Sequence, residues 1–159
     1  MAVTTDIVQS YRHPRTVIRR YLDAGENEGR ALIILMGACL LIFVSQWPIL
    51  ARQAFLDPSQ PLEARMSGAL MGTVFLLPLL CYGLAALSHL VARLFGGKGS
   101  FFGARLALFL ALLATAPLML LNGLVGGFIG EGPGVLIVGF LVLSGFLAIW
   151  LLMLIEAER

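Results

Sequence analysis

Four long stretches of this chain carry no charged side chain, and short polar segments separate them. The stretches cover residues 31–51, 66–92, 106–130 and 132–155. A helix crosses a hydrocarbon core of ~30 Å with about 20 apolar residues, and lipid offers the backbone no other hydrogen-bond partner. The pattern therefore predicts an all-α, polytopic transmembrane bundle with four spans in one domain, 31–155. We expect these spans at about residues 31–50, 66–95, 103–124 and 135–155.

Turn residues indicate where these spans begin and end. Trp47-Pro48 is typical of an outer membrane interface and predicts the end of the first span. Turn chemistry at 57–61 predicts a connector, after which a helix restarts at Pro61 and continues into the second span. The glycine cluster at 96–100 predicts a tight turn on the opposite side. The glycines of 126–134 predict a flexible outer connector.

Residues 1–30 form a separate amphipathic segment before the first span. Pro14 fits the first turn of a helix, where a missing N–H has no consequence. In that helix the apolar side chains share one side: Val17, Ile18, Tyr21 and Leu22. Arginines flank them: Arg15, Arg19 and Arg20. The pattern fits an interfacial amphipathic helix in the headgroup plane and, equally, a solvated helix packed on the cytoplasmic end of the bundle.

The composition excludes an ordinary soluble domain. Apolar residues make up 59% of the chain and charged residues 13%, whereas soluble domains carry about 45–50% apolar and about 25% charged residues. The first thirty residues lack the apolar core of a cleavable signal peptide, so the first span is expected to act as its own insertion signal. Cys39 and Cys81 lie inside apolar runs, and we interpret them as small buried hydrophobes.

Basic residues are distributed unequally between the two sides of the predicted bundle. Nine of the 11 fall on one side: Arg12, Arg15, Arg19, Arg20, Arg30, Arg93, Lys98, Arg105 and Arg159. The other side receives Arg52 and Arg65. Short loops rich in arginine and lysine stay in the cytoplasm, so both termini are predicted to be cytoplasmic. Arginine outnumbers lysine ten to one, which favours a GC-rich bacterial genome and the bacterial inner (cytoplasmic) membrane.

Small residues recur at four-residue spacing in the second and third spans. They are Gly68 and Gly72 in the second, Gly103, Ala107, Ala111 and Thr115 in the third, and Gly123 and Gly127 at its end. Such spacing lets helix backbones approach one another closely. We favour packing within the monomer, and homodimerisation is the alternative.

Pro78 and Pro117 lie near the middle of neighbouring spans. Each proline removes one backbone hydrogen bond and frees the carbonyl four residues earlier, on Val74 and Leu113. A static kink that neighbouring helices repair is the favoured interpretation. A hinge, or the wall of a cavity, is the alternative.

Basic residues on the expected cytoplasmic side offer the main candidates for ligand contact. Lys98 lacks the spacing of a nucleotide-binding loop, because Gly99 follows it and no strand precedes it. Neither a nucleotide nor a nucleic acid is therefore expected as a partner. Contact with lipid phosphates is an alternative to a purely topological role. The candidates for it are Arg15, Arg19, Arg20, Arg93, Lys98 and Arg105.

His89 is the only histidine within a predicted span. Its place near the interface favours a side chain hydrogen-bonded to its neighbours over a proton relay or a ligand. A catalytic dyad with Ser144 fails because the two residues differ in depth by roughly 8 Å. The spans carry no charged residue near their centres, which argues against an ion-coupled carrier. We therefore expect no enzyme, and no catalytic, cofactor-binding or metal-binding residue.

Three features together resemble the bacterial Yip-domain proteins, relatives of the eukaryotic Ypt/Rab-interacting membrane proteins. They are His13-Pro14-Arg15 before the first span, the 96–100 glycine cluster with Phe101 after a long second span, and Pro117 in the third. The similarity covers about residues 7–124. It implies a multi-pass integral membrane protein without catalytic residues. Eukaryotic members usually have five spans and associate with small GTPases, but no residue here matches such a binding epitope.

These observations favour a non-enzymatic inner-membrane protein that organises the membrane or scaffolds membrane partners. Its expected partners are membrane lipids, and a second copy of the chain or other membrane proteins. The alternative is a passive transporter or lipid-translocating protein hinged at Pro78 and Pro117.

Overall fold

The computed structural model describes residues 3–159, which form helices joined by short turns. In chain order the elements are α1 (Val3–Arg12), α2 (Pro14–Asp23), α3 (Glu28–Leu56), α4 (Leu62–Leu70), the π-helix η1 (Met71–Leu76), α5 (Leu77–Leu94), α6 (Phe101–Phe128) and α7 (Pro133–Ala157). The elements α4, η1 and α5 make one continuous rod. Four helical segments are long and apolar enough to cross a membrane: α3, the α4–α5 rod, α6 and α7. This confirms the all-α, four-span architecture.

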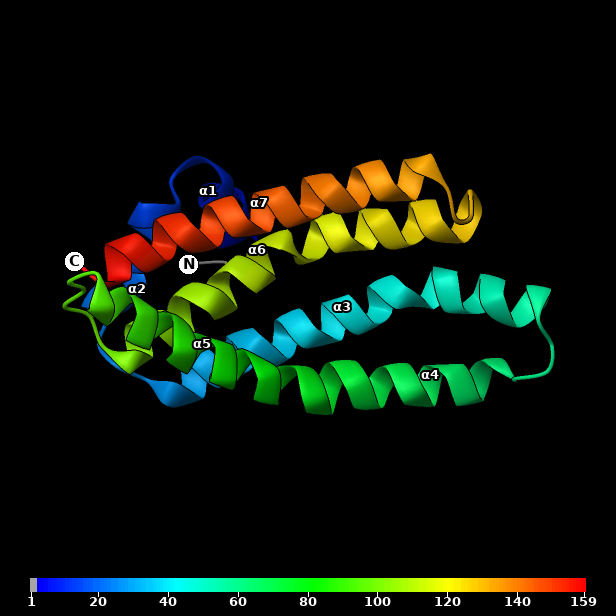
Figure 1. Ribbon diagram of the computed structural model, residues 1–159, viewed down its shortest axis with the longest axis horizontal. Helices are drawn as coiled ribbons and strands as arrows, with labels where there is room; N and C mark the ends of the chain where they lie inside the picture. The colour runs from blue at the N-terminus through cyan, green and yellow to red at the C-terminus, as the bar shows by residue number, and fades with distance from the viewer. Residues whose placement is uncertain (1–2) are drawn as a thin grey trace.

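The helix α6 is the centre of the bundle. Its side chains from Phe102 to Ala116 are almost all buried, because α3, α5 and α7 pack around it and α1 covers part of its remaining side. The α3 helix and the α4–α5 rod form one antiparallel hairpin, and α6 with α7 forms the other (Figure 1). The outward sides of the spans stay apolar, with Leu79 70% and Phe140 69% exposed. Such surfaces suit contact with acyl chains.

Two predicted helix limits were wrong, and close packing at one seam explains both. The helix that contains the first span does not end at Trp47-Pro48, because α3 continues through Pro48 to Leu56. The connector predicted at 126–134 is shorter, because α6 continues to Phe128. Pro48 packs against Gly127, and the missing hydrogen bond of one proline is tolerated where neighbouring helices hold both sides of the kink.

The α4–α5 rod, which forms the second span, contains a π-helical segment that ends two residues before Pro78. Within η1 the hydrogen bonds run one residue further than in an α-helix, and the Leu77 N–H donates to the carbonyl of Gly72, five residues earlier. A proline ring clashes with the carbonyl four residues before it, and a wider turn is one way to relieve that clash. By contrast, α6 passes Pro117 as a continuous α-helix.

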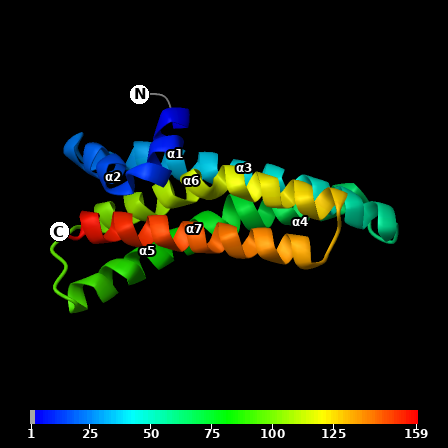
Figure 2. The same cartoon turned by 90° about the horizontal axis from the view of Figure 1, so that it is seen from above.

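The N-terminal segment consists of α1 and α2, which lie against the bundle near the end that carries both termini (Figure 2). The apolar stripe of α2 faces protein, since Val17 and Ile18 are both 0% exposed. Of the two interpretations left open above, packing on the bundle therefore describes α2. Its neighbours are α7 and α6.

Candidate functional site

Polar interactions concentrate at one end of the bundle. We call this the terminal end: it carries α1, α2, the glycine loop 96–100 and the last residues, 156–159. Figure 1 shows it at the left, opposite the turns that join α3 to α4 and α6 to α7. Three of its contacts join segments that lie far apart in the chain, Arg19 with Glu156, Arg105 with Glu28, and His89 with Glu158. Two more, made by Asp6 and Arg30, hold the N-terminal helices to one another and to α3.

A buried ion pair or hydrogen bond joins α5 to the last residues of the chain. The Nδ1 atom of His89 lies 2.6 Å from Oε1 of Glu158, and the two residues are 2% and 7% exposed. The second carboxylate oxygen of Glu158 accepts a hydrogen bond of 3.1 Å from the Gly99 N–H. The ring of Phe101 covers the imidazole, with 4.3 Å between the ring centroids. We call this arrangement the carboxylate latch.

The glycine loop is shaped to hold the carboxylate latch. The Lys98 N–H donates to the backbone carbonyl of Glu158 at 2.7 Å. A Cβ atom on Gly99 would lie 2.3 Å from the carbonyl oxygen of Ala157, and one on Gly97 would lie 2.8 Å from the Glu158 carboxylate. Real Cβ atoms do not approach so closely, so these two positions require glycine. The loop thus binds a carboxylate from its own chain.

A second polar cluster holds α1 to α2. Asp6 is 3% exposed; it forms an ion pair with Arg20 and accepts a hydrogen bond of 2.6 Å from the Tyr21 hydroxyl. Arg30, at the start of α3, donates to the backbone carbonyls of Tyr21 and Gly25. The guanidinium of Arg30 also lies over the Tyr21 ring, 5.2 Å from its centroid. These contacts fix the N-terminal helices to the beginning of the first span.

The Tyr21–Asp6 hydrogen bond makes the docking of α1 sensitive to alkali. Burial, followed by the hydrogen bond to Asp6, raises the pKa of Tyr21 from its ordinary value of 10.0 to about 12. A phenol that ionises less readily in the docked state stabilises that state below pH 10, and this contribution is lost as the pH rises through 12. In a tyrosinate absorbance titration, the difference between the wild type and Tyr21→Phe should therefore have its midpoint near 12. A midpoint near 10 would contradict the buried hydrogen bond.

The basic residues predicted to contact lipid headgroups all lie at the terminal end, in two groups. Three of them pair with carboxylates of the chain: Arg19 with Glu156, Arg20 with Asp6, and Arg105 with Glu28. The other three are exposed: Arg15, Arg93 and Lys98. The paired arginines tie α2 to α7 and α6 to α3, so they have a structural role that needs no lipid.

The small residues predicted to mediate helix packing also divide into two groups. In α6, Ala107, Ala111 and Thr115 are 0% exposed. A Cβ on Gly103 would contact the Ala157 Cβ at 3.4 Å. Cβ atoms on Gly68 and Gly72 would meet nothing within 4 Å, so no neighbouring helix in the monomer requires glycine at these positions. Their place in a homodimer stays a prediction.

The closest helix approach lies at the end of α6, where it crosses α3. A Cβ atom on Gly123 would lie 1.8 Å from the carbonyl oxygen of Ser45, and one on Gly127 would lie 2.3 Å from Cβ of Pro48. The guanidinium of Arg52 lies against Gly130 and donates to the carbonyls at the C-terminal end of α6. The spacing of Gly123 and Gly127 indicates this contact in the sequence, whereas the involvement of Arg52 has no sequence signal.

Of the two predicted kink prolines, Pro117 lies next to a contact with the N-terminal segment. The Tyr11 hydroxyl of α1 donates to the carbonyl of Ala114, three residues before Pro117. Ala114 lies nine residues beyond Arg105 on α6, roughly 13 Å along the helix axis. The α1 helix therefore lies alongside the span and does not sit on top of it. Pro78, in contrast, is buried at the start of α5.

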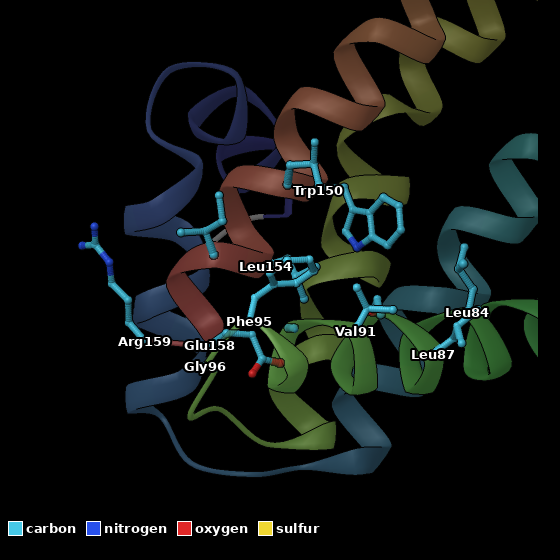
Figure 3. Close-up of a pocket in the computed structure, with 14 residues that line it drawn as sticks. Leu84, Leu87, Val91, Phe95, Gly96, Trp150, Leu154, Glu158 and Arg159 are labelled. Atoms are coloured by element: carbon cyan, nitrogen blue, oxygen red, sulfur yellow. The ribbon is translucent and has the colours of Figure 1, made fainter.

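A groove between α5 and α7 adjoins the carboxylate latch. Its volume is about 570 Å³, and it is lined almost entirely by apolar side chains, among them Leu84, Val91 and Leu154. Figure 3 shows the Trp150 ring between the two helices, with Glu158 at the end of the groove nearest the glycine loop. Glu158 and Arg159 are the titratable residues among those that line it. Within residues 3–159, no group of three or more His, Cys, Asp or Glu side chains is placed to hold a metal ion.

Comparison with known families identifies the architecture. The model of the Yip1 domain matches residues 8–156, which is nearly the whole described chain.

The chain belongs to the Yip1-domain family.

The match to the Yip1 domain confirms the resemblance seen in the sequence and extends it. Similarity judged from the sequence stopped near residue 124, whereas the family match continues through α7. Together with four candidate spans, the Yip1 domain makes this a multi-pass membrane protein. No curated protein and no solved structure gives a significant match.

Proposed function

We propose that this Yip1-domain protein is a non-enzymatic organiser of the membrane that scaffolds other membrane proteins. One observation carries the proposal: α1 is docked firmly on the bundle yet keeps an apolar surface exposed. Val3, Val8 and Tyr11 are 53%, 61% and 43% exposed, while Asp6 joins α1 to α2 and the Tyr11 hydroxyl joins it to α6. A rigid, preformed apolar surface of this kind suits contact with a partner.

The distribution of charge supports a cytoplasmic position for this surface. Nine of the 11 basic residues belong to the terminal end, and by the positive-inside rule this distribution supports a cytoplasmic position for both termini. The exposed Arg15, Arg93 and Lys98 are the residues best placed to contact anionic headgroups there. Each such contact contributes about 1 kcal/mol near an anionic surface.

Photocrosslinking in intact cells tests the scaffolding proposal. A photoreactive residue at Val8 should give a discrete adduct with another membrane protein, because Val8 is the most exposed of these three side chains at 61%. The same group at Leu136, which is 73% exposed on α7, is the matched control and should give lipid adducts.

A variant that loosens the terminal end makes this experiment decisive. Asp6→Ala removes the ion pair with Arg20 and the hydrogen bond from Tyr21 that hold α1 to α2, and it should lower the Val8 adduct at least fivefold while leaving the Leu136 adducts unchanged. If Val8 gives the same lipid adducts as Leu136, the scaffolding proposal is wrong.

The π-helix before Pro78 favours one second candidate, a passive transporter or lipid-translocating protein. Widened turns are found often at functional sites, and η1 lies in the middle of the α4–α5 rod. This function requires that the reconstituted protein moves lipid analogues or small solutes across vesicle membranes. If the reconstituted protein moves neither lipid analogues nor small solutes, this second candidate function is wrong.

A further inference from the structure

A cavity lies in the part of the bundle that crosses the membrane, between α3, α6 and α7. Its volume is about 340 Å³. Three polar side chains line it: Ser45 and Gln46 from α3, and Asn122 from α6. The remaining walls are apolar, and Met119, Val142 and Phe146 supply much of them. Polar groups that converge in an otherwise apolar cavity are the usual composition of a small-molecule site.

The Asn122 side chain is incompletely satisfied in this cavity. Its Oδ1 atom is buried and has no hydrogen-bond partner among the described residues. An amide oxygen removed from water without a donor is costly, and hydrocarbon around a span supplies none. Because Oδ1 is closed off, Asn122 can reach a molecule in the cavity only through its Nδ2 group, which is a hydrogen-bond donor.

The position of the cavity limits what that molecule can be. Asn122 lies six residues before the end of α6, roughly 9 Å along the helix axis, which is below the level of lipid phosphates. No Asp, Glu, Lys or Arg lines the cavity, so a charged headgroup would lose its hydration there without a compensating partner. The fitting group is uncharged, and it both donates and accepts hydrogen bonds, as a hydroxyl does.

The cavity also opens toward the lipid. Leu143, on its rim, is 55% exposed. Gly139 leaves space beside Asn122, because a Cβ there would lie 3.8 Å from Nδ2. A molecule held by its polar group at Asn122 can therefore extend an acyl chain into the bilayer.

From these observations we infer that the Ser45–Gln46–Asn122 cavity binds a neutral membrane lipid with a free hydroxyl group, of the diacylglycerol class. The lipid hydroxyl accepts from Nδ2 of Asn122 and donates to Oε1 of Gln46. This inference requires only that the bundle spans a membrane, and it does not depend on the proposed scaffolding function.

Thermal unfolding of the full-length protein in phosphatidylcholine nanodiscs tests the inference. Addition of dioleoylglycerol should raise Tm. Two analogues with the same acyl chains should not: the 3-O-methyl ether, which lacks the donor hydrogen, and phosphatidic acid, which is charged. If either analogue raises Tm as much as dioleoylglycerol, or if dioleoylglycerol has no effect, the inference is overturned.

Variants separate ligand binding from folding. Asn122→Leu removes the unsatisfied amide, so its ligand-free Tm should equal or exceed that of the wild type, yet dioleoylglycerol should no longer shift it. Gly139→Leu, which fills the cavity, should also abolish the shift, whereas Ser88→Ala in the α5–α7 groove should retain it. A persistent shift in both cavity variants would overturn the inference.

A photoreactive diacylglycerol then locates the binding site. Its adducts should map to the α3, α6 and α7 residues around the cavity and fall at least fivefold in Asn122→Leu. Adducts on α5 instead would overturn the inference. A Leu143→Cys variant tests whether a second copy of the chain occupies the cavity: a disulfide between two copies that prevents labelling by the probe would also overturn the inference.

Discussion

Replacing Gly123 by alanine should destabilise the bundle by about 3 kcal/mol, a large effect for the addition of one methyl group. The new Cβ atom would lie 1.8 Å from the carbonyl oxygen of Ser45. Because that oxygen belongs to the backbone of α3, no side-chain rotation can relieve the clash. The two helices must separate, and the neighbouring contacts of Pro48 and Arg52 with α6 would weaken with them. Unfolding of the purified protein in micelles by increasing dodecyl sulfate measures the loss.

The chain provides a matched control for this substitution. Gly68→Ala adds the same methyl group to a membrane-spanning helix, but its Cβ meets nothing within 4 Å. Its free energy of unfolding should change by no more than about 1 kcal/mol, the range of the intrinsic helix preference of alanine over glycine. Equal effects at the two positions would show that the seam between α3 and α6 does not have the described geometry.

Glu158→Ala should cost roughly 3 kcal/mol, because it leaves the other half of a buried pair without a partner. The substitution removes the acceptor of the Gly99 N–H and leaves the buried His89 ring without its hydrogen-bond partner. Glu158→Gln keeps an acceptor of the same size and should lose less than half as much. The conformational readout is protease sensitivity of the glycine loop, which should rise in Glu158→Ala.

A double-mutant cycle separates the carboxylate latch from general effects of substitution. Replacing both partners, as in His89→Leu with Glu158→Leu, should cost less than the sum of the single changes, since no buried polar group remains unpaired. Glu131→Ala provides the control at the opposite end: it removes an exposed carboxylate and should change stability by less than about 0.5 kcal/mol. Additive effects of the two latch substitutions would argue against a direct interaction.

The spans could be predicted from the sequence because a helix needs about twenty consecutive apolar residues to cross a lipid bilayer. Helix ends were harder to predict. Pro48 is a breaker in isolation, and only the glycines of α6, more than seventy positions away, explain why α3 continues past it. The Pro14 helix start and the restart after Pro61 were predicted correctly because both depend on local backbone chemistry.

The carboxylate latch could not be found from the sequence, for a different reason. Glu158 and His89 are 69 positions apart, and neither has a neighbour that reveals the other. The glycine loop was recognised as a turn, but the need for glycine at positions 97 and 99 comes from contact with the chain end. Asn122 was likewise overlooked, because one amide in an apolar run has no distinctive pattern until α3 and α7 are placed around it.

The contact between α2 and α7 has a consequence for the order of events during translation. Arg19 and Glu156 are separated by 137 positions, and ribosomes add roughly 5–20 residues per second. The N-terminal helices are therefore made roughly 7–27 s before the residues of α7 that bind them. The contact between α2 and α7 forms late in biogenesis. A nascent chain that stalls before Glu156 would leave Arg19 without that partner.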